Sequence, residues 1–153
     1  MRFKFVVFIC LINVIGLGTF SQNLSDNTNT YNSNQKPHGK WVYLNKNTNS
    51  IQAKGTYKNG VPVGRWFIFD ENGNKFIIKK YRRRRTREVW FYPNGKVESK
   101  GWSKLISDDP KEINYYWEGI WKFYNEKGKL IQKKIYSEGE VIKILKDTSD
   151  VGI

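Results

Sequence analysis

Apolar and aromatic residues beyond Gly39 occur in short runs that are separated by polar turns. Runs such as "RWFIF" and "KLIQKKIY" are too short for helices, and their aromatic and β-branched side chains favour strands. The turns contain Gly73, Gly95 and Gly128, which supply the positive φ that tight hairpin turns demand. Each pair of runs therefore predicts a β-hairpin. Residues 66–69 are apolar at consecutive positions, so these strands are either covered on both faces or reset in register by bulges.

The hairpins repeat along the chain. Residues 64–81 and 119–136 share Gly, Trp, Glu, Gly, Lys and Tyr at matching offsets, and the intervals between units fall in the range typical of repeat architectures, roughly 20–50 residues. Because an isolated hairpin is marginally stable in water, we expect consecutive hairpins to pair edge to edge into one antiparallel sheet. The predicted structural anchors are four aromatic pairs (Trp41 with Tyr57, Trp66 with Tyr81, Trp90 with Trp102, Trp121 with Tyr136) and the glycines Gly39, Gly64, Gly73, Gly95, Gly119 and Gly128.

This unit resembles the MORN repeat, and more specifically the repeats of the bacterial MORN-repeat-variant family. The resemblance covers residues 39–141, and the third unit departs most, because Glu88 stands where the leading glycine belongs and its turn is shorter. The resemblance implies an all-β fold, with consecutive hairpins in one elongated, curved antiparallel sheet. Such sheets serve as interaction or scaffolding surfaces, in some cases linked to lipid or membrane contact, and some bacterial members are classed as antitoxins. The matching residues are Gly39, Trp41, Tyr57, Asn59, Gly60, Gly64, Trp66, Phe69, Gly73, Gly119, Trp121, Tyr124, Gly128, Tyr136 and Gly139.

The first 21 residues have the order of a secretory signal peptide. Basic Arg2 and Lys4 precede an apolar run, which small residues follow up to Ser21. This pattern predicts export to the periplasm or the medium after cleavage, with an uncleaved N-terminal membrane anchor as the alternative. The predicted organisation is a signal peptide at 1–21, a disordered Asn/Ser/Thr-rich leader at 22–38, a repeat domain at 39–143 with an insert near 103–116, and a C-terminal tail at 144–153.

The chain is strongly basic, with 27 Lys and Arg against 14 Asp and Glu and a formal net charge of +13. Such a charge attracts anionic surfaces. For an exported protein we expect either a protein partner or an anionic envelope component, namely a lipid head group, lipopolysaccharide or an acidic glycan, with peripheral membrane contact as one form of this binding. Nucleic acid is disfavoured, because the aromatic side chains occupy repeat anchors rather than positions between the arginines.

The densest positive charge is the sequence "KKYRRRRTR". Its four consecutive arginines replace the turn residues "KNGV" of the preceding unit, so we expect them in a connecting turn. Guanidinium groups match phosphate and carboxylate geometry, which favours an anion site. The alternatives are a protease-sensitive loop and a solvated turn that like charges keep open. The candidate residues are Lys79, Lys80, Arg82, Arg83, Arg84, Arg85 and Arg87.

The remaining chemistry argues against an enzyme. His38 is the only histidine and Cys10 the only cysteine, so no catalytic triad, thiol site or His-rich metal site is expected, and no cofactor motif occurs. The insert carries Asp108, Asp109 and Glu112, which form either a solvated loop, a helical turn or the acidic tip of a longer hairpin arm. The sequence therefore predicts an exported, non-enzymatic β-repeat interaction module. The alternatives are an antitoxin or immunity-type protein and an envelope structural protein that assembles through its terminal sheet edges.

Overall fold

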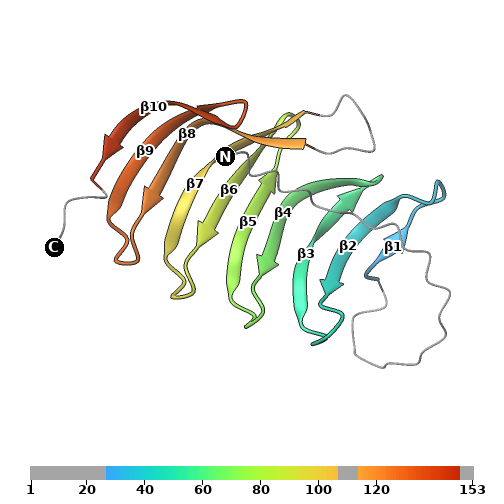
Figure 1. Ribbon diagram of the computed structural model, residues 1–153. Helices are drawn as coiled ribbons and strands as arrows, with labels where there is room; N and C mark the ends of the chain where they lie inside the picture. Colours follow the sequence, from blue (N-terminus) through green and yellow to red (C-terminus); the bar gives the residue numbers. More distant parts are fainter. Residues whose placement is uncertain (1–26, 107–113, 149–153) are drawn as a thin grey trace.

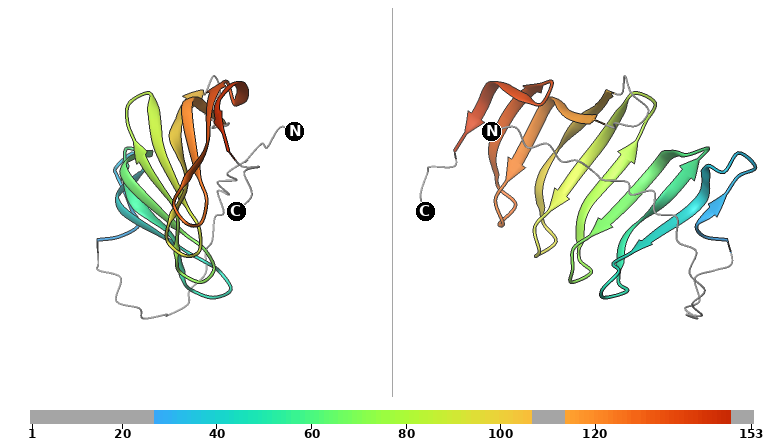
Figure 2. Two further views of the ribbon diagram at one scale, coloured as in Figure 1. Left: turned by 90° about the vertical axis from the view of Figure 1, so that its left-hand side faces the viewer. Right: turned by 45° about the vertical axis from the view of Figure 1, so that its right-hand side comes forward.

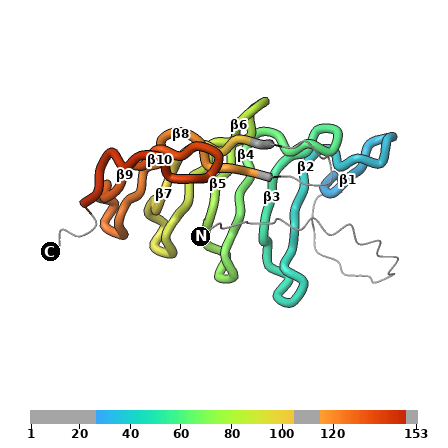
Figure 3. Tube along the Cα trace, turned by 45° about the horizontal axis from the view of Figure 1, so that its top comes forward, coloured from blue at the N-terminus to red at the C-terminus, as the bar shows by residue number. Residues whose placement is uncertain are grey.

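Ten β-strands pair in chain order into one open antiparallel sheet (Figure 1). The computed structural model describes residues 27–106 and 114–148, and this part of the chain contains no helix. The sheet is elongated and curved, with β1 and β10 at opposite ends (Figures 2 and 3), which confirms the predicted fold class. The strands are β1 (Thr30–Tyr31), β2 (Pro37–Leu44), β3 (Ile51–Lys58), β4 (Val61–Phe69), β5 (Lys75–Tyr81), β6 (Arg85–Phe91), β7 (Val97–Ile106), β8 (Asn114–Tyr124), β9 (Leu130–Ser137) and β10 (Glu140–Asp147).

The hairpin turns close as the glycine pattern predicts. Gly73, Gly95 and Gly128 have φ angles of 81°, 80° and 87°. Each of these glycines donates its N–H to the carbonyl three residues earlier; for Gly73 the acceptor is Asp70, at 3.0 Å. The Asp70 carboxylate also accepts the backbone N–H of Asn74 at 2.8 Å. The turn sequence thus satisfies its own backbone donors and sets where each strand pair begins.

Three buried tryptophans on one face of the sheet, here called the aromatic face, form the core of the repeat. Each indole reaches back across the preceding strand and donates its Nε1–H to a backbone carbonyl there, so burial leaves no unpaired donor. The pairs are Trp41 with Thr30 at 3.2 Å, Trp66 with Thr56 at 3.1 Å and Trp121 with Trp102 at 2.9 Å.

Two glycines allow this close approach. A Cβ atom on Gly55 would lie 2.1 Å from the Trp66 ring, and one on Gly101 would lie 2.2 Å from the Trp121 ring. The strand register shifts at both glycines, so each is the extra residue of a bulge. The indole therefore packs directly on the backbone of its neighbour strand.

We expect Gly101→Ala to lower the free energy of unfolding by about 1–3 kcal/mol, because the new methyl group overlaps the Trp121 indole. Urea denaturation of the single variants Gly101→Ala and Trp121→Ala and of the double variant measures the effect. If the new methyl group destabilises the fold by overlapping the indole, adding Gly101→Ala to the Trp121→Ala variant should change the free energy of unfolding very little. Strictly additive losses would contradict the packing described here.

The sheet extends past the predicted domain bounds at both ends. Residues assigned to the disordered leader form β1 and the start of β2, and Tyr31 packs edge-on against Trp41 at 5.3 Å. The physical reason is that Trp41, like its counterparts, needs a preceding strand to cover it. At the other end β10 continues to Asp147, into the predicted C-terminal tail. The predicted signal peptide and the acidic residues of the insert lie outside the described residues.

Trp102 is not the third-unit counterpart of the other anchor aromatics, which corrects the predicted pairing with Trp90. Trp90 stands opposite Ser99 on β7, whereas Trp102, three residues beyond Ser99, stands opposite Arg87. Alternate residues of a strand point to opposite faces, so Trp102 lies on the face away from Trp90. The position equivalent to Tyr57 is held instead by Ser103, which is fully buried.

Trp117 on β8 takes the space that a third-unit tyrosine would fill. Its ring stacks on Trp121 with centroids 3.8 Å apart and meets Tyr136 edge-on at 5.2 Å. β7 and β8 are the longest strands, so the insert lengthens this hairpin arm up to Ile106 and again from Asn114. The arm crosses the aromatic face, because Lys79 Nζ lies 5.2 Å from the ring centroid of Tyr115.

Candidate anion-binding surface

At least one basic side chain lies on the same face of each strand from β2 to β10, opposite the aromatic face. Residues that are cross-strand partners share a face of the sheet, and so do residues two positions apart on one strand. Each basic residue of this set is linked to the next one by such a partnership, by a step of two positions, or by both. Arg65, Lys80 and Arg87 are direct neighbours. The full set, here called the basic stripe, is Lys40, Lys54, Arg65, Lys80, Arg87, Lys100, Lys122, Lys133 and Lys146.

The stripe has no acidic partners in the described part of the chain. The one ion pair within residues 27–106 and 114–148 joins Lys79 to Glu88 on the aromatic face. Four lysines at the end of the stripe stand in direct cross-strand succession, with strands about 4.8 Å apart. Like charges placed directly opposite each other destabilise a sheet. The stripe is therefore a line of positive charge that forms no ion pair within the described residues. These four lysines are Lys100, Lys122, Lys133 and Lys146.

Three of the predicted arginines surround Trp102. The guanidinium carbon of Arg85 lies 4.1 Å from the Trp102 ring centroid, and those of Arg87 and Arg82 lie at 5.4 Å and 5.9 Å. The Arg82 N–H donates to the Arg85 carbonyl at 3.0 Å, so these residues bracket a closed connecting turn, as the sequence predicts. We call Arg82, Arg85, Arg87 and Trp102 the arginine cluster. Arg83 and Arg84 are exposed at the tip of the same turn.

Lys79 does not join the other candidates, because it points to the aromatic face. Its Nζ lies 3.6 Å from the carboxylate of Glu88, which is 2% exposed. That carboxylate also accepts the Ser103 hydroxyl at 2.6 Å and the Trp90 indole N–H at 3.1 Å. Burial, reinforced by the nearby Tyr115 hydroxyl, raises the pKa of Tyr81, which therefore stays neutral beside this pair. The group is a satisfied polar centre within the aromatic face.

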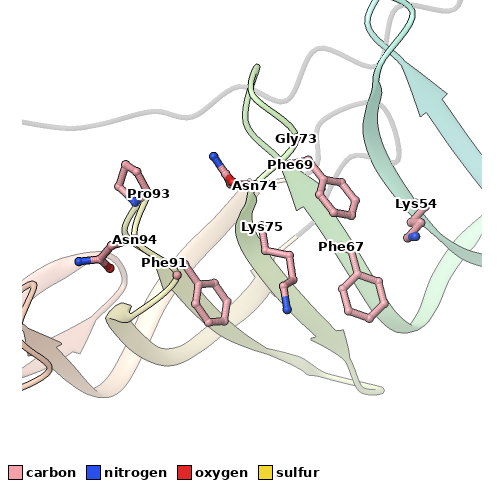
Figure 4. Close-up of a pocket in the computed structure, with 10 residues that line it drawn as sticks. Lys54, Phe67, Phe69, Gly73, Asn74, Lys75, Phe91, Pro93 and Asn94 are labelled. Carbon is pink, nitrogen blue, oxygen red and sulfur yellow. The ribbon is translucent and has the colours of Figure 1, made fainter.

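Open grooves on the basic face place aromatic rings beside cations. A groove of about 630 Å³ is lined by Phe67, Phe69 and Phe91 together with Lys54 and Lys75 (Figure 4). Lys54 Nζ lies 5.5 Å from the Phe69 ring centroid. A second groove of about 380 Å³ contains the middle of the stripe, and its lining residues are Arg87, Lys100, Trp102, Ile120, Lys122 and Lys133.

The described residues offer little for other chemistry. Residues 27–106 and 114–148 contain no cluster of three or more His, Cys, Asp or Glu side chains that is placed to hold a metal ion. In the same part of the chain we find no helix with the length and apolar character that a membrane crossing requires.

The fold and this surface define a β-hairpin repeat protein with one aromatic and one basic face. Residues 87–101 and 117–141, which include most of β6 and half of β7 and reach from β8 into β10, match the model of the MORN repeat variant family. The resemblance noted in the sequence is thereby confirmed over these residues. No curated protein and no solved structure matches the chain. The chain thus contains MORN-variant repeats, a module that generally mediates binding and is typically non-catalytic.

The first units have the same geometry although they lie outside the matched residues. Trp66 packs on Gly55 as Trp121 packs on Gly101, with the same indole-to-carbonyl hydrogen bond. The repeat therefore continues through β2 to β5 in structure.

Sequence reasoning missed most of the basic stripe. The only signal was a Lys or Arg in each apolar run, and the face it occupies depends on bulges that the spacing does not reveal.

Proposed function

We propose that this protein is a non-catalytic binding module that, once exported, binds a linear acidic glycan of the cell envelope along its basic stripe. The observation that carries this proposal is the stripe itself: at least one basic side chain lies on the same face of nine successive strands, and no stripe residue forms an ion pair within the described residues. A row of like charges attracts polyanions and raises their local concentration.

The shape of the stripe favours a chain over a flat surface. The positive charges form a line that crosses every strand from β2 to β10. Neighbouring strands rotate relative to one another, and the whole sheet curves (Figure 2). A flexible polymer follows such a curved line, whereas a planar bilayer touches only part of it. The half-exposed rings of Phe67, Phe69 and Phe91 beside the lysines also suit sugar rings.

The envelope enters the proposal through the first 21 residues, whose pattern predicts export. Outside the cytoplasm, acidic glycans are abundant linear polyanions. The proposed partner is therefore defined by its chemistry, as a linear glycan with a negative charge on each repeating unit.

Heparin retention tests the proposal. We expect replacement of Lys100, Lys122 and Lys133 by Ser to shift elution to lower salt and to reduce the slope of log affinity against log salt by about 2–3. The matched control replaces Lys46, Lys96 and Lys127, three exposed turn lysines away from the stripe, and thus changes the net charge equally.

The control variant should lose much less retention than the stripe variant. Equal losses would show that net charge alone sets retention, and the proposal would fail. Anionic liposomes form the second arm: if they bind the protein more tightly than heparin does, a membrane surface rather than a glycan is the partner. Because like charges repel across the strands, the stripe variant should unfold at no lower temperature than wild type.

A further inference from the structure

The arginine cluster brings three guanidinium groups to one indole ring on the basic face. Their carbons lie between 4.1 and 5.9 Å from the Trp102 ring centroid. Three like charges gathered around one ring repel, so a cluster of this kind needs compensation. The indole provides part of it, because the face of a tryptophan ring attracts cations.

The backbone beneath the cluster is fixed. Arg82 and Arg85 bracket a turn closed by a hydrogen bond of 3.0 Å, and Thr86 beside them is buried. The buried Ser103 hydroxyl reaches the Thr86 carbonyl at 3.5 Å, and Trp102 stands opposite Arg87 in the sheet register. The backbone that carries these side chains is therefore held by the turn and by the sheet, so an anion is bound without ordering a mobile loop.

The cluster has no carboxylate partner in the described part of the chain. Glu118 is the cross-strand neighbour of Trp102; its carboxylate accepts the Glu138 backbone N–H at 3.2 Å and forms no ion pair with the cluster. A guanidinium that lies over a ring, as Arg85 does at 4.1 Å, keeps its N–H donors free in the plane of the group. No ion pair ties Arg82, Arg85 or Arg87 to a described carboxylate, so their donors are available to a ligand.

We infer that the arginine cluster is a discrete site for a tetrahedral oxyanion, a phosphate or sulfate ester group, and that Trp102 is its positioning residue. A single guanidinium already satisfies both oxygens of a carboxylate. Three groups converging from separate positions suit an anion with three terminal oxygens, such as phosphate, which carries a charge of about −1.5 to −2. The inference rests on the proposed function, since the ester group would belong to the bound glycan.

The test follows the arginine Nε–H and indole Nε1–H signals of the full chain by NMR during titration with inorganic phosphate, inorganic sulfate or acetate at constant ionic strength. We expect saturable shifts of the cluster signals with phosphate or sulfate and none with acetate. The tetrahedral anion that binds more tightly identifies the ester. Shifts that are unsaturable, or equal for all three anions, would overturn the inference.

Two variants test the role of Trp102. Trp102→Leu keeps an apolar side chain but removes the ring face, and we expect the phosphate affinity to fall about two- to fivefold. Trp102→Phe restores a ring and should recover part of that loss. Equal affinity in Trp102→Leu and wild type would remove the positioning role, and unchanged binding in Arg85→Ser would remove the site.

A separate variant distinguishes this site from the proposed function. Replacement of Lys40 and Lys54 by Ser changes the stripe on β2 and β3, far along the sheet from Trp102 on β7. It should lower heparin retention and leave the phosphate-induced shifts unchanged. A loss of the phosphate shifts in this variant would mean that general positive charge, and not the arginine cluster, binds the anion.

Discussion

Replacing Trp121 by alanine is expected to lower the free energy of unfolding by about 3–5 kcal/mol. Trp121 is the largest side chain that is fully buried in the described residues. Its indole stacks on Trp117 at 3.8 Å, packs on the bare backbone of Gly101, and donates to the Trp102 carbonyl at 2.9 Å. Truncation removes all three interactions together and leaves a cavity that the surrounding strands close only in part.

Urea denaturation monitored by circular dichroism measures this loss. The control is Ile120→Ala, the adjacent residue on the opposite face, whose side chain is 44% exposed. We expect the control to cost much less, since surface substitutions usually stay within about 0.5 kcal/mol. A domain of this size has a total stability of roughly 5–15 kcal/mol, so the Trp121 variant should be close to unfolding at physiological temperature. Similar losses for both variants would show that the aromatic face does not stabilise the sheet as described.

The two faces of the sheet are coupled through one residue. The Trp102 carbonyl accepts the Trp121 indole N–H, while the Trp102 side chain lies among the arginines on the other face. The bulge at Gly101 makes this possible. It brings the Trp102 carbonyl within reach of the Trp121 indole and leaves the Trp102 ring on the opposite face, among the arginines. Core packing therefore sets the position of the proposed oxyanion site.

The hairpins and their order could be predicted from the sequence because their signals are local. The turn glycines Gly73, Gly95 and Gly128 and the short aromatic runs each act within a few residues. The tetra-arginine turn followed from aligning one unit with the next. These features depend on backbone conformation and repeat spacing, which a sequence shows directly.

The face occupied by each side chain could not be predicted. A single extra residue in a strand exchanges the two faces, and register shifts occur next to Gly55 and Gly101. Trp102 was expected in the core because it ends an aromatic interval, yet the buried position belongs to Ser103, one residue further on. For the same reason the basic stripe could not be predicted, and Lys79 was wrongly grouped with the anion-site candidates although it lies on the aromatic face.

Two linked changes distinguish the third unit from the other repeats, because the two residues involved form an ion pair. Lys79 stands where Gly55 and Gly101 receive an indole, and Glu88 stands where Gly64 and Gly119 have positive φ angles. Without the glycine, the following tryptophan has no bare backbone to pack on. Its N–H turns to the Glu88 carboxylate instead of a backbone carbonyl.

We therefore expect Glu88→Ala to lower the free energy of unfolding by about 3–5 kcal/mol, comparable with the loss of the core tryptophan. Removal of this carboxylate leaves the Lys79 ammonium without its counterion and the Ser103 hydroxyl and Trp90 N–H without their acceptor. Glu88→Gln should cost less, because the amide oxygen still accepts a hydrogen bond although the charge is lost.

The double variant Lys79→Met, Glu88→Leu distinguishes a charge effect from a packing effect. Replacing a buried ion pair by apolar side chains of similar volume is often neutral or stabilising. We expect the double variant to be much more stable than Glu88→Ala in urea denaturation at neutral pH. If both variants lose equal stability, the volume of Glu88, and not the unpaired ammonium, explains the cost. If neither loses stability, the Lys79–Glu88 pair is not what replaces the glycine–indole contact in the third unit.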